Sequence, residues 1–201
     1  MKESDQVMSV TYTNRKGRTY FLCKRITKTG KPRYFFAREP KGETVEEIPI
    51  GYKISESVNG IVSLVKDRPS LIKPEEISSV EAEITQHPQG RRYKVSAKHD
   101  RIVIFEMVDP DAKELAGIFE LSGFSTPGLE DRIQEHLEQN SQYTAVMQFI
   151  LADPEQRTFR AQRWCYLGGI DDWIDIEYGT SEELSSRLIP LLGTETFFDL
   201  Y

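Results

Sequence analysis

The chain has very little cysteine and histidine. Its 201 residues include only Cys23 and Cys165, which lie in opposite halves and within apolar stretches. A disulfide scaffold is therefore excluded, and we expect both thiols to pack as small hydrophobic groups. The three histidines, His87, His99 and His136, are too scattered to complete a structural zinc site with two thiols. We accordingly predict no metal centre of this kind.

Long hydrophobic runs are missing as well. No segment approaches the roughly 18 uninterrupted apolar residues of a membrane span, and the first residues, MKESDQVM, lack the apolar core of a signal peptide. We therefore expect no membrane partner and a reducing, cytoplasmic location. The strings GxxxxGK[ST], GxGxxG, GxSxG and HExxH are also absent, so no common nucleotide, hydrolase or metalloprotease motif points to a cofactor.

Charge is distributed unevenly along the chain, although the net charge is only −6. Residues 15–38 contain nine basic residues and no Asp or Glu, whereas residues 106–201 contain six basic and nineteen acidic residues. The basic segment could bind nucleic acid or another polyanion. It could equally dock on the acidic half, within the chain or across a homo-oligomer.

The first third of the chain has the pattern of an antiparallel β meander. Residues 9–14, 19–26 and 33–39 alternate and are rich in β-branched and aromatic residues, with turns at RKG and TKTGKP. In residues 51–67, Asn59-Gly60 separates two alternating runs, which predicts a hairpin with a type I′ turn. The composition changes near Arg68-Pro69-Ser70, and we place the domain boundary after residue 72.

The remainder predicts a mixture of helices and hairpins. Pro74 begins a helix with Ile77, Val80 and Ile84 on one face, and a second helix is expected over residues 128–140. Residues 93–98 with 101–108, and 143–151 with 158–167, form two predicted hairpins, whereas residues 109–128 have no regular pattern. Thr180 and Glu183 match a capping box that begins a last helix. The fold class is therefore α+β with antiparallel sheets: a basic β module, residues 1–72, and an acidic α+β domain, residues 73–201.

Two strings of the sequence resemble a family of uncharacterised prokaryotic proteins. The first is NRKGRTYFL with TKTGKPRYFF, near the N-terminus, and the second is FRAQRWCYLGGIDDW, nearer the C-terminus. Both strings are unusual, but together they cover well under half of the chain. The family has no assigned activity, so the resemblance implies a shared fold and no particular chemistry.

The basic β module is the first candidate site. Its cations are interleaved with aromatic residues, the combination with which single-strand binders contact phosphates and stack bases. The same aromatics could instead form the core of the module, with the cations as a solvated edge. The candidate binding residues are Tyr20, Lys24, Arg25, Lys28, Lys31, Arg33 and Tyr34.

The second candidate site is the acidic segment GGIDDWIDIEY, with Asp171, Asp172, Trp173 and Asp175. If it is extended, Asp171, Asp175 and Glu177 share a face, and hard cations prefer such oxygen ligands. The alternative is structural, with Asp171 or Asp172 paired to Arg160 or Arg163. Our leading hypothesis is a non-catalytic binding protein that uses the basic module, and an enzyme or metal-binding protein with a carboxylate site around Asp171–Asp175 is the alternative.

Overall fold

The computed structural model describes residues 9–110, 112–123, 126–166 and 171–200, and it divides the chain into two compact units. Unit 1 is Met1–Arg68 and unit 2 is Pro69–Tyr201. The boundary thus falls four residues before the expected position. Ile72 is buried in the core of unit 2, and the Leu71 N–H donates to the His99 carbonyl, so this short segment packs with the second unit. The α+β class with antiparallel sheets is confirmed.

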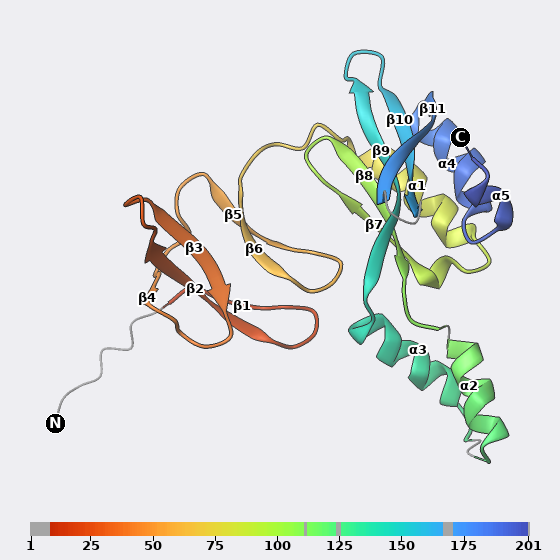
Figure 1. Ribbon diagram of the computed structural model, residues 1–201, viewed down its shortest axis with the longest axis horizontal. Coiled ribbons are helices and arrows are strands. Elements are labelled where there is room, and N and C mark those ends of the chain that lie inside the picture. The colour runs from red at the N-terminus through yellow and green to blue at the C-terminus, as the bar shows by residue number, and fades with distance from the viewer. Residues whose placement is uncertain (1–8, 111, 124–125, 167–170, 201) are drawn as a thin grey trace. The chain divides into compact units, whose positions relative to one another are not determined.

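Unit 1 is an all-β module, coloured red to orange in Figure 1. Strand β2 is its centre and pairs antiparallel with β1, β3 and the short β4, whereas β5 and β6 form a separate hairpin. Its fully or nearly buried apolar side chains are Leu22, Cys23 and Val62. The strands are β1 (Thr11–Thr13), β2 (Thr19–Ile26), β3 (Pro32–Ala37), β4 (Glu43–Thr44), β5 (Tyr52–Glu56) and β6 (Val62–Lys66).

Three turns of unit 1 share one construction. In each, the N–H of the first residue donates to the carbonyl of the fifth, and the N–H of a glycine at the fourth position donates to the carbonyl of the first. The glycine has a positive φ in all three turns. This is the three-residue hairpin loop, a type I turn followed by a left-handed residue. The segments are Asn14–Arg18, Thr27–Lys31 and Ser57–Ile61.

The prediction of a type I′ turn at Asn59-Gly60 is therefore wrong. Such a turn needs positive φ at both central residues, but only Gly60 has one, at 74°. The loop has three residues rather than the two of a type I′ hairpin. Its length follows from the pairing of Glu56 with Val62 and from the hydrogen bond of the Ser57 N–H to the Ile61 carbonyl. The Ser57 hydroxyl accepts hydrogen bonds from the N–H groups of Asn59 and Ile61, which stabilises the wider loop.

Asn14 links two of these turns inside unit 1. Its side chain is buried, its Oδ1 accepts from the N–H groups of Lys16 and Arg18, and its Nδ2 donates to the Gly60 carbonyl at 2.6 Å. Glu56 adds a second link, because it accepts hydrogen bonds from the Tyr12 hydroxyl and the Arg15 N–H. The bond to Glu56 raises the pKa of Tyr12. Polar contacts thus hold a module whose apolar core is small.

Replacing Asn14 by alanine is expected to destabilise unit 1 by about 2 kcal/mol, because it leaves buried backbone groups without partners. Native-state hydrogen exchange of the β2 amides measures this, since both tryptophans, Trp164 and Trp173, lie in unit 2 and report only on that unit. The matched control is Thr27→Ala, which removes the equivalent side-chain acceptor from an exposed turn. If Asn14→Ala and Thr27→Ala reduced the protection of the β2 amides from hydrogen exchange equally, this role of Asn14 would be wrong.

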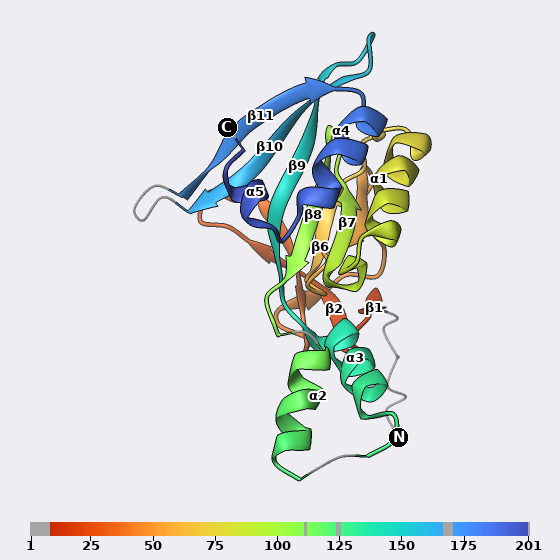
Figure 2. The ribbon, with the colours of Figure 1, turned by 90° about the vertical axis from the view of Figure 1, so that its right-hand side faces the viewer.

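Unit 2 is a five-stranded antiparallel meander in the order β11-β10-β9-β8-β7. Figure 2 shows α1 and α4 side by side against one face of this sheet. Fully buried side chains between sheet and helices include Ile102, Met147, Phe149, Phe159 and Leu184. The strands are β7 (Tyr93–Ala97), β8 (Arg101–Met107), β9 (Tyr143–Asp153), β10 (Thr158–Tyr166) and β11 (Asp171–Gly179).

Two helices of unit 2, α1 and α4, begin where the sequence predicts. Pro74 opens α1, and the side chain of Thr180 accepts from the Glu183 N–H in the predicted capping box of α4. An α-helix, α2, occupies part of the segment that showed no regular pattern. The helices are α1 (Pro74–Gln86), α2 (Ala112–Leu121), α3 (Leu129–Asn140), α4 (Ser181–Leu188) and α5 (Glu195–Phe198), with 3₁₀ turns at Gly90–Arg92 and Ile189–Leu191. No helix among the described residues has the length and apolar character needed to cross a membrane.

Helices α2 and α3 form a hairpin inserted between β8 and β9. They lie against each other and extend away from the sheet in both views (Figures 1 and 2). At the base of the insertion, the Val108 N–H donates to the Gln142 carbonyl at 2.9 Å. The ladder between β8 and β9 therefore continues up to the point where the chain leaves the sheet.

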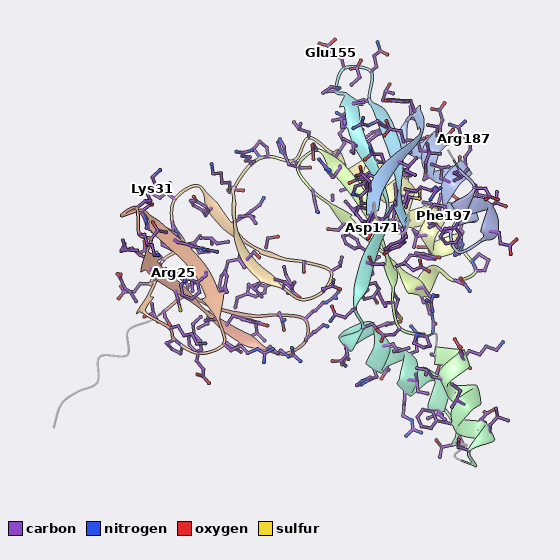
Figure 3. The ribbon with its side chains drawn as sticks, viewed as in Figure 1. Arg25, Lys31, Glu155, Asp171, Arg187 and Phe197 are labelled. Atoms are coloured by element: carbon purple, nitrogen blue, oxygen red, sulfur yellow. The ribbon has the colours of Figure 1, made fainter. Side chains whose placement is uncertain are left out.

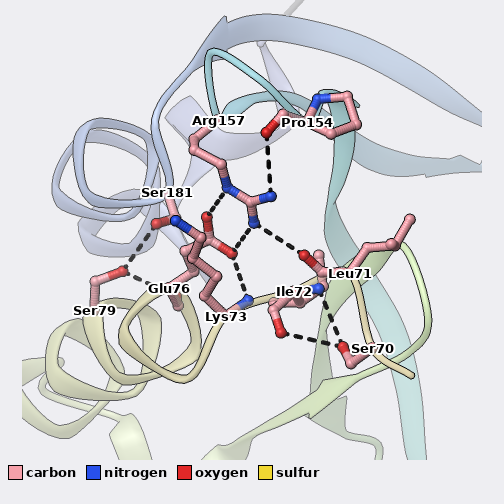
Figure 4. Close-up of polar contacts among 9 residues, drawn as sticks. All are labelled: Ser70, Leu71, Ile72, Lys73, Glu76, Ser79, Pro154, Arg157 and Ser181. Atoms are coloured by element: carbon pink, nitrogen blue, oxygen red, sulfur yellow. Dashed lines mark hydrogen bonds and ion pairs between the residues drawn. The ribbon is translucent and has the colours of Figure 1, made fainter.

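An ion pair between the half-buried Arg157 and the buried Glu76 joins the turn between β9 and β10 to α1 (Figure 4). The Arg157 guanidinium donates to both carboxylate oxygens of Glu76, at 2.7 and 2.5 Å, and to the carbonyls of Leu71 and Pro154. Glu76 also accepts from the Lys73 N–H at the start of α1. Arg157 is the one non-glycine residue with positive φ in the described part of the chain, at 55°. The turn is thus held in an uncommon backbone conformation by the contacts of its arginine.

Arg163 is also buried, with 3% of its surface exposed. It lies on the same face of β10 as Phe159, because the two residues are four positions apart in one strand. Its guanidinium donates to the carbonyl oxygens of Phe198 and Leu200, both at 2.8 Å. It therefore anchors the C-terminal helix α5 to the sheet.

Candidate functional site

The end of the β2–β3 hairpin carries four cations and no carboxylate. From Arg25 to Arg33 every residue is exposed except Thr27, which is half-buried. The tight turn at Thr27–Lys31 presents two lysines, and the paired strands present two arginines. Figure 3 shows Arg25 and Lys31 on this hairpin. We call this surface the basic hairpin and define it by Arg25, Lys28, Lys31 and Arg33.

Few of these charges are neutralised within the chain. The neighbouring Lys24 forms an ion pair of 3.6 Å with Glu43, and the Arg25 guanidinium lies 5.6 Å from the ring centroid of Phe35. Lys28, Lys31 and Arg33 have no ion-pair partner among the residues that the structure describes. Three cations are thus available to an external anion.

The candidate residues of the basic module do not all share one face. Lys24 and Tyr34 are a cross-strand pair, as are Arg25 and Arg33, and the two pairs lie on opposite faces because they are adjacent along the strands. Tyr20 is half-buried opposite Tyr12 on β1, and the Tyr34 ring lies 6.5 Å from that of Tyr52. The two tyrosines therefore pack within unit 1, while Lys28 and Lys31 project from the turn.

From Asp171 onwards the acidic segment forms β11, an edge strand of the sheet in unit 2, whereas its first three residues, 168–170, lie outside the described residues. Asp171 and Trp173 pair with Tyr166 and Trp164 of β10, and Asp175 pairs with Gln162, all on the face opposite the helices. The Trp164 ring stands edge to face with the rings of Trp173 and Tyr166, at centroid distances of 5.3 and 6.2 Å. Asp172 lies on the other face and accepts from the Trp173 N–H.

A bulge separates Glu177 from the other carboxylates. The register between β10 and β11 shifts at Ala161/Gln162, so Glu177 faces the helices and pairs with Arg187 of α4 at 3.2 Å. The expectation that Asp171, Asp175 and Glu177 share a face is therefore wrong. Within the described ranges, no group of three or more His, Cys, Asp or Glu side chains could hold a metal ion.

Asp175 ends a row of hydrogen bonds that crosses four strands. Arg101 donates to Gln148, Gln148 donates to Gln162 at 2.8 Å, and Gln162 donates to Asp175 at 2.6 Å. Two further contacts complete the row. Arg160 forms an ion pair with Asp175 at 3.5 Å, and Arg101 donates twice to Asp100, whose pKa it lowers.

This row changes the interpretation of the acidic segment. The carboxylate that pairs with Arg160 is Asp175, rather than the predicted Asp171 or Asp172, because Asp175 shares the face to which Arg160 points. Gln148 and Gln162, a buried cross-strand pair, were not predicted, because a single glutamine within a strand carries no signal of its partner. With both oxygens of Asp175 already engaged, this carboxylate serves the sheet as a hydrogen-bond acceptor.

Comparison of the chain with family models, with curated proteins and with solved structures finds no match.

Proposed function

We propose that the protein is a non-catalytic binding protein whose basic hairpin contacts the phosphate backbone of single-stranded nucleic acid. One observation carries the proposal: the exposed end of the β2–β3 hairpin holds four cations, none of which has an ion-pair partner among the described residues, and only Arg25 lies against an aromatic ring. A narrow two-stranded ribbon with two arginines on one face and two lysines on its turn can follow a chain of phosphates.

The surroundings of the hairpin favour phosphate contacts over base stacking. Tyr20 and Tyr34 are half-buried and adjacent to other tyrosines, which restricts their ring faces. Binding should therefore be insensitive to base sequence and strongly dependent on salt. The alternative carboxylate site is less well supported, because Asp175 is engaged with Arg160 and Gln162.

Fluorescence anisotropy of a labelled single-stranded oligonucleotide, titrated with the full chain at several salt concentrations, tests this proposal. If Lys28, Lys31 and Arg33 each neutralise one phosphate, the log-log dependence of affinity on salt should have a slope of about −2, at about −0.7 per phosphate. No anisotropy change at low salt would refute the proposal. Sedimentation at the same salt concentrations separates the competing case, in which salt shifts an oligomer equilibrium and nucleic acid stays unbound.

A further inference from the structure

The α2–α3 hairpin presents an uncovered helix face. The buried residues of the two helices are Ala112 and Ala116 on α2 and Leu137 on α3. The opposite face of α2 borders an open hollow, and on it Ile118 and Leu121 are 55% and 91% exposed. Two large apolar side chains thus point to solvent on an element that extends away from the sheet, which is typical of a contact surface.

Gly117 stands in the middle of this face and packs against no other element among the residues that the structure describes. A β-carbon built there would meet no atom within 4 Å, apart from its own helix and neighbours. A glycine in a helix interior is destabilising by about 1 kcal/mol relative to alanine. The described contacts of the chain give no compensation for this cost, whereas a second helix crossing at Gly117 could approach more closely than at any other residue.

The charges around Gly117 are self-complementary. Lys113 and Glu120 are seven residues apart, so they project from nearly the same side of α2, on either side of Gly117 along the helix. Neither has an ion-pair partner in the described ranges of the chain. In an antiparallel pair with a two-fold axis at Gly117, Lys113 of each copy lies beside Glu120 of the other. A parallel pair would instead place like charges at the same height.

We propose that this face of α2 is a homodimer contact, occupied by α2 of a second copy of the chain in antiparallel orientation. The two-fold axis passes Gly117, two equivalent Lys113–Glu120 ion pairs flank one side of the contact, and Ile118 and Leu121 bury apolar surface on the other side. This contact is isologous, so it closes on itself and yields a dimer rather than a filament.

Sedimentation velocity of the full chain, from about 1 to 200 µM, should show a monomer–dimer equilibrium. Lys113→Glu and Glu120→Lys should each weaken the dimer about tenfold, because each replaces two ion pairs with two repulsions. The double variant restores both pairs in reversed polarity and should recover the wild-type dissociation constant. A double variant as weak as the single ones would overturn the antiparallel arrangement, and a wild-type chain that stays monomeric throughout would overturn the proposal itself.

Gly117→Gln gives a second test, because it should stabilise α2 in the monomer and weaken the dimer. In the monomer the new β-carbon meets no described atom within 4 Å, and the change to a better helix former should raise the helicity of α2. In the dimer it occupies the crossing point and should weaken association about tenfold or more. Glu135→Lys, an exposed residue of α3 with the same charge change as Glu120→Lys, is the matched control and should leave the dimer unchanged. Dimerisation of Gly117→Gln at wild-type strength would exclude a close crossing at this residue.

Discussion

Arg157→Ala is expected to lower the free energy of unfolding of unit 2 by about 3 kcal/mol, because it leaves the buried Glu76 carboxylate without its cation. The Leu71 and Pro154 carbonyls lose a donor at the same time. Urea unfolding followed by tryptophan fluorescence measures this change, since Trp164 and Trp173 both lie in unit 2. Arg160→Ala is the matched control, because it breaks the half-exposed pair with Asp175 and should cost less than about 1 kcal/mol.

The same pair sets a pH dependence. Burial acts to raise the pKa of Glu76, but the hydrogen bonds from Arg157 and from the Lys73 N–H outweigh it and lower the pKa from its ordinary value of 4.5. The stabilisation is therefore complete above about pH 4.5 and is lost as the pH falls through the lowered pKa of the folded chain. The stability difference between wild type and Arg157→Ala should narrow accordingly below about pH 4.5. A difference that stays constant down to pH 3 would indicate that the arginine acts mainly through its backbone contacts.

Neutralising the basic hairpin is expected to lower affinity for single-stranded nucleic acid about 100-fold at low salt, or about 2.7 kcal/mol. The variant combines Lys28→Ala, Lys31→Ala and Arg33→Ala, which removes the three cations without a partner. The hydrogen bonds of this turn come from the backbone and from Thr27, so the hairpin itself should persist. Anisotropy titrations should show the salt slope falling towards zero together with the affinity.

The control for this variant removes the same charge elsewhere in unit 1. Arg38, Lys41 and Arg68 are exposed and outside the basic hairpin, and their combined replacement by alanine changes the net charge equally. If binding depends on local phosphate contacts, this control should retain most of the affinity and of the salt slope. A loss equal to that of the hairpin variant would show that net charge alone, rather than the hairpin, attracts the oligonucleotide.

The strands were the most predictable part of the fold, because alternation and turn residues are local signals. Thr19–Ile26 was predicted with the bounds that β2 has, and Pro74 and Thr180 correctly located the starts of α1 and α4. Helix α2 was missed because Gly117 lies in its middle, although the string Asp111-Ala112-Lys113-Glu114 has the spacing of a capping box. The predicted turn type at Asn59-Gly60 was wrong. The pairing of Glu56 with Val62 sets the length of the loop, and this length outweighs the preference of the Asn-Gly dipeptide for a type I′ turn.

For the candidate sites, the sequence predicted which segments carry the charges but not which side chains share a face. The run of cations identified the basic segment, but strand pairing decided that Arg25 and Arg33 lie on one face and Lys24 and Tyr34 on the other. On β11, the bulge that turns Glu177 to the opposite face depends on register, which a single sequence does not encode locally. The choice of Asp175 as the partner of Arg160 has the same origin.

The order of the strands in unit 2 has a consequence for how this sheet forms. Every strand pairs with its neighbour in the chain, so most of the sheet can grow by closing short loops, which favours rapid folding. The exception is β8 with β9, whose ends are separated by residues 108–142. Once α2 and α3 have paired, the hydrogen bond from Val108 to Gln142 closes a structured loop instead of a flexible one. Early formation of the helical hairpin would therefore lower the entropic barrier to joining the two halves of the sheet.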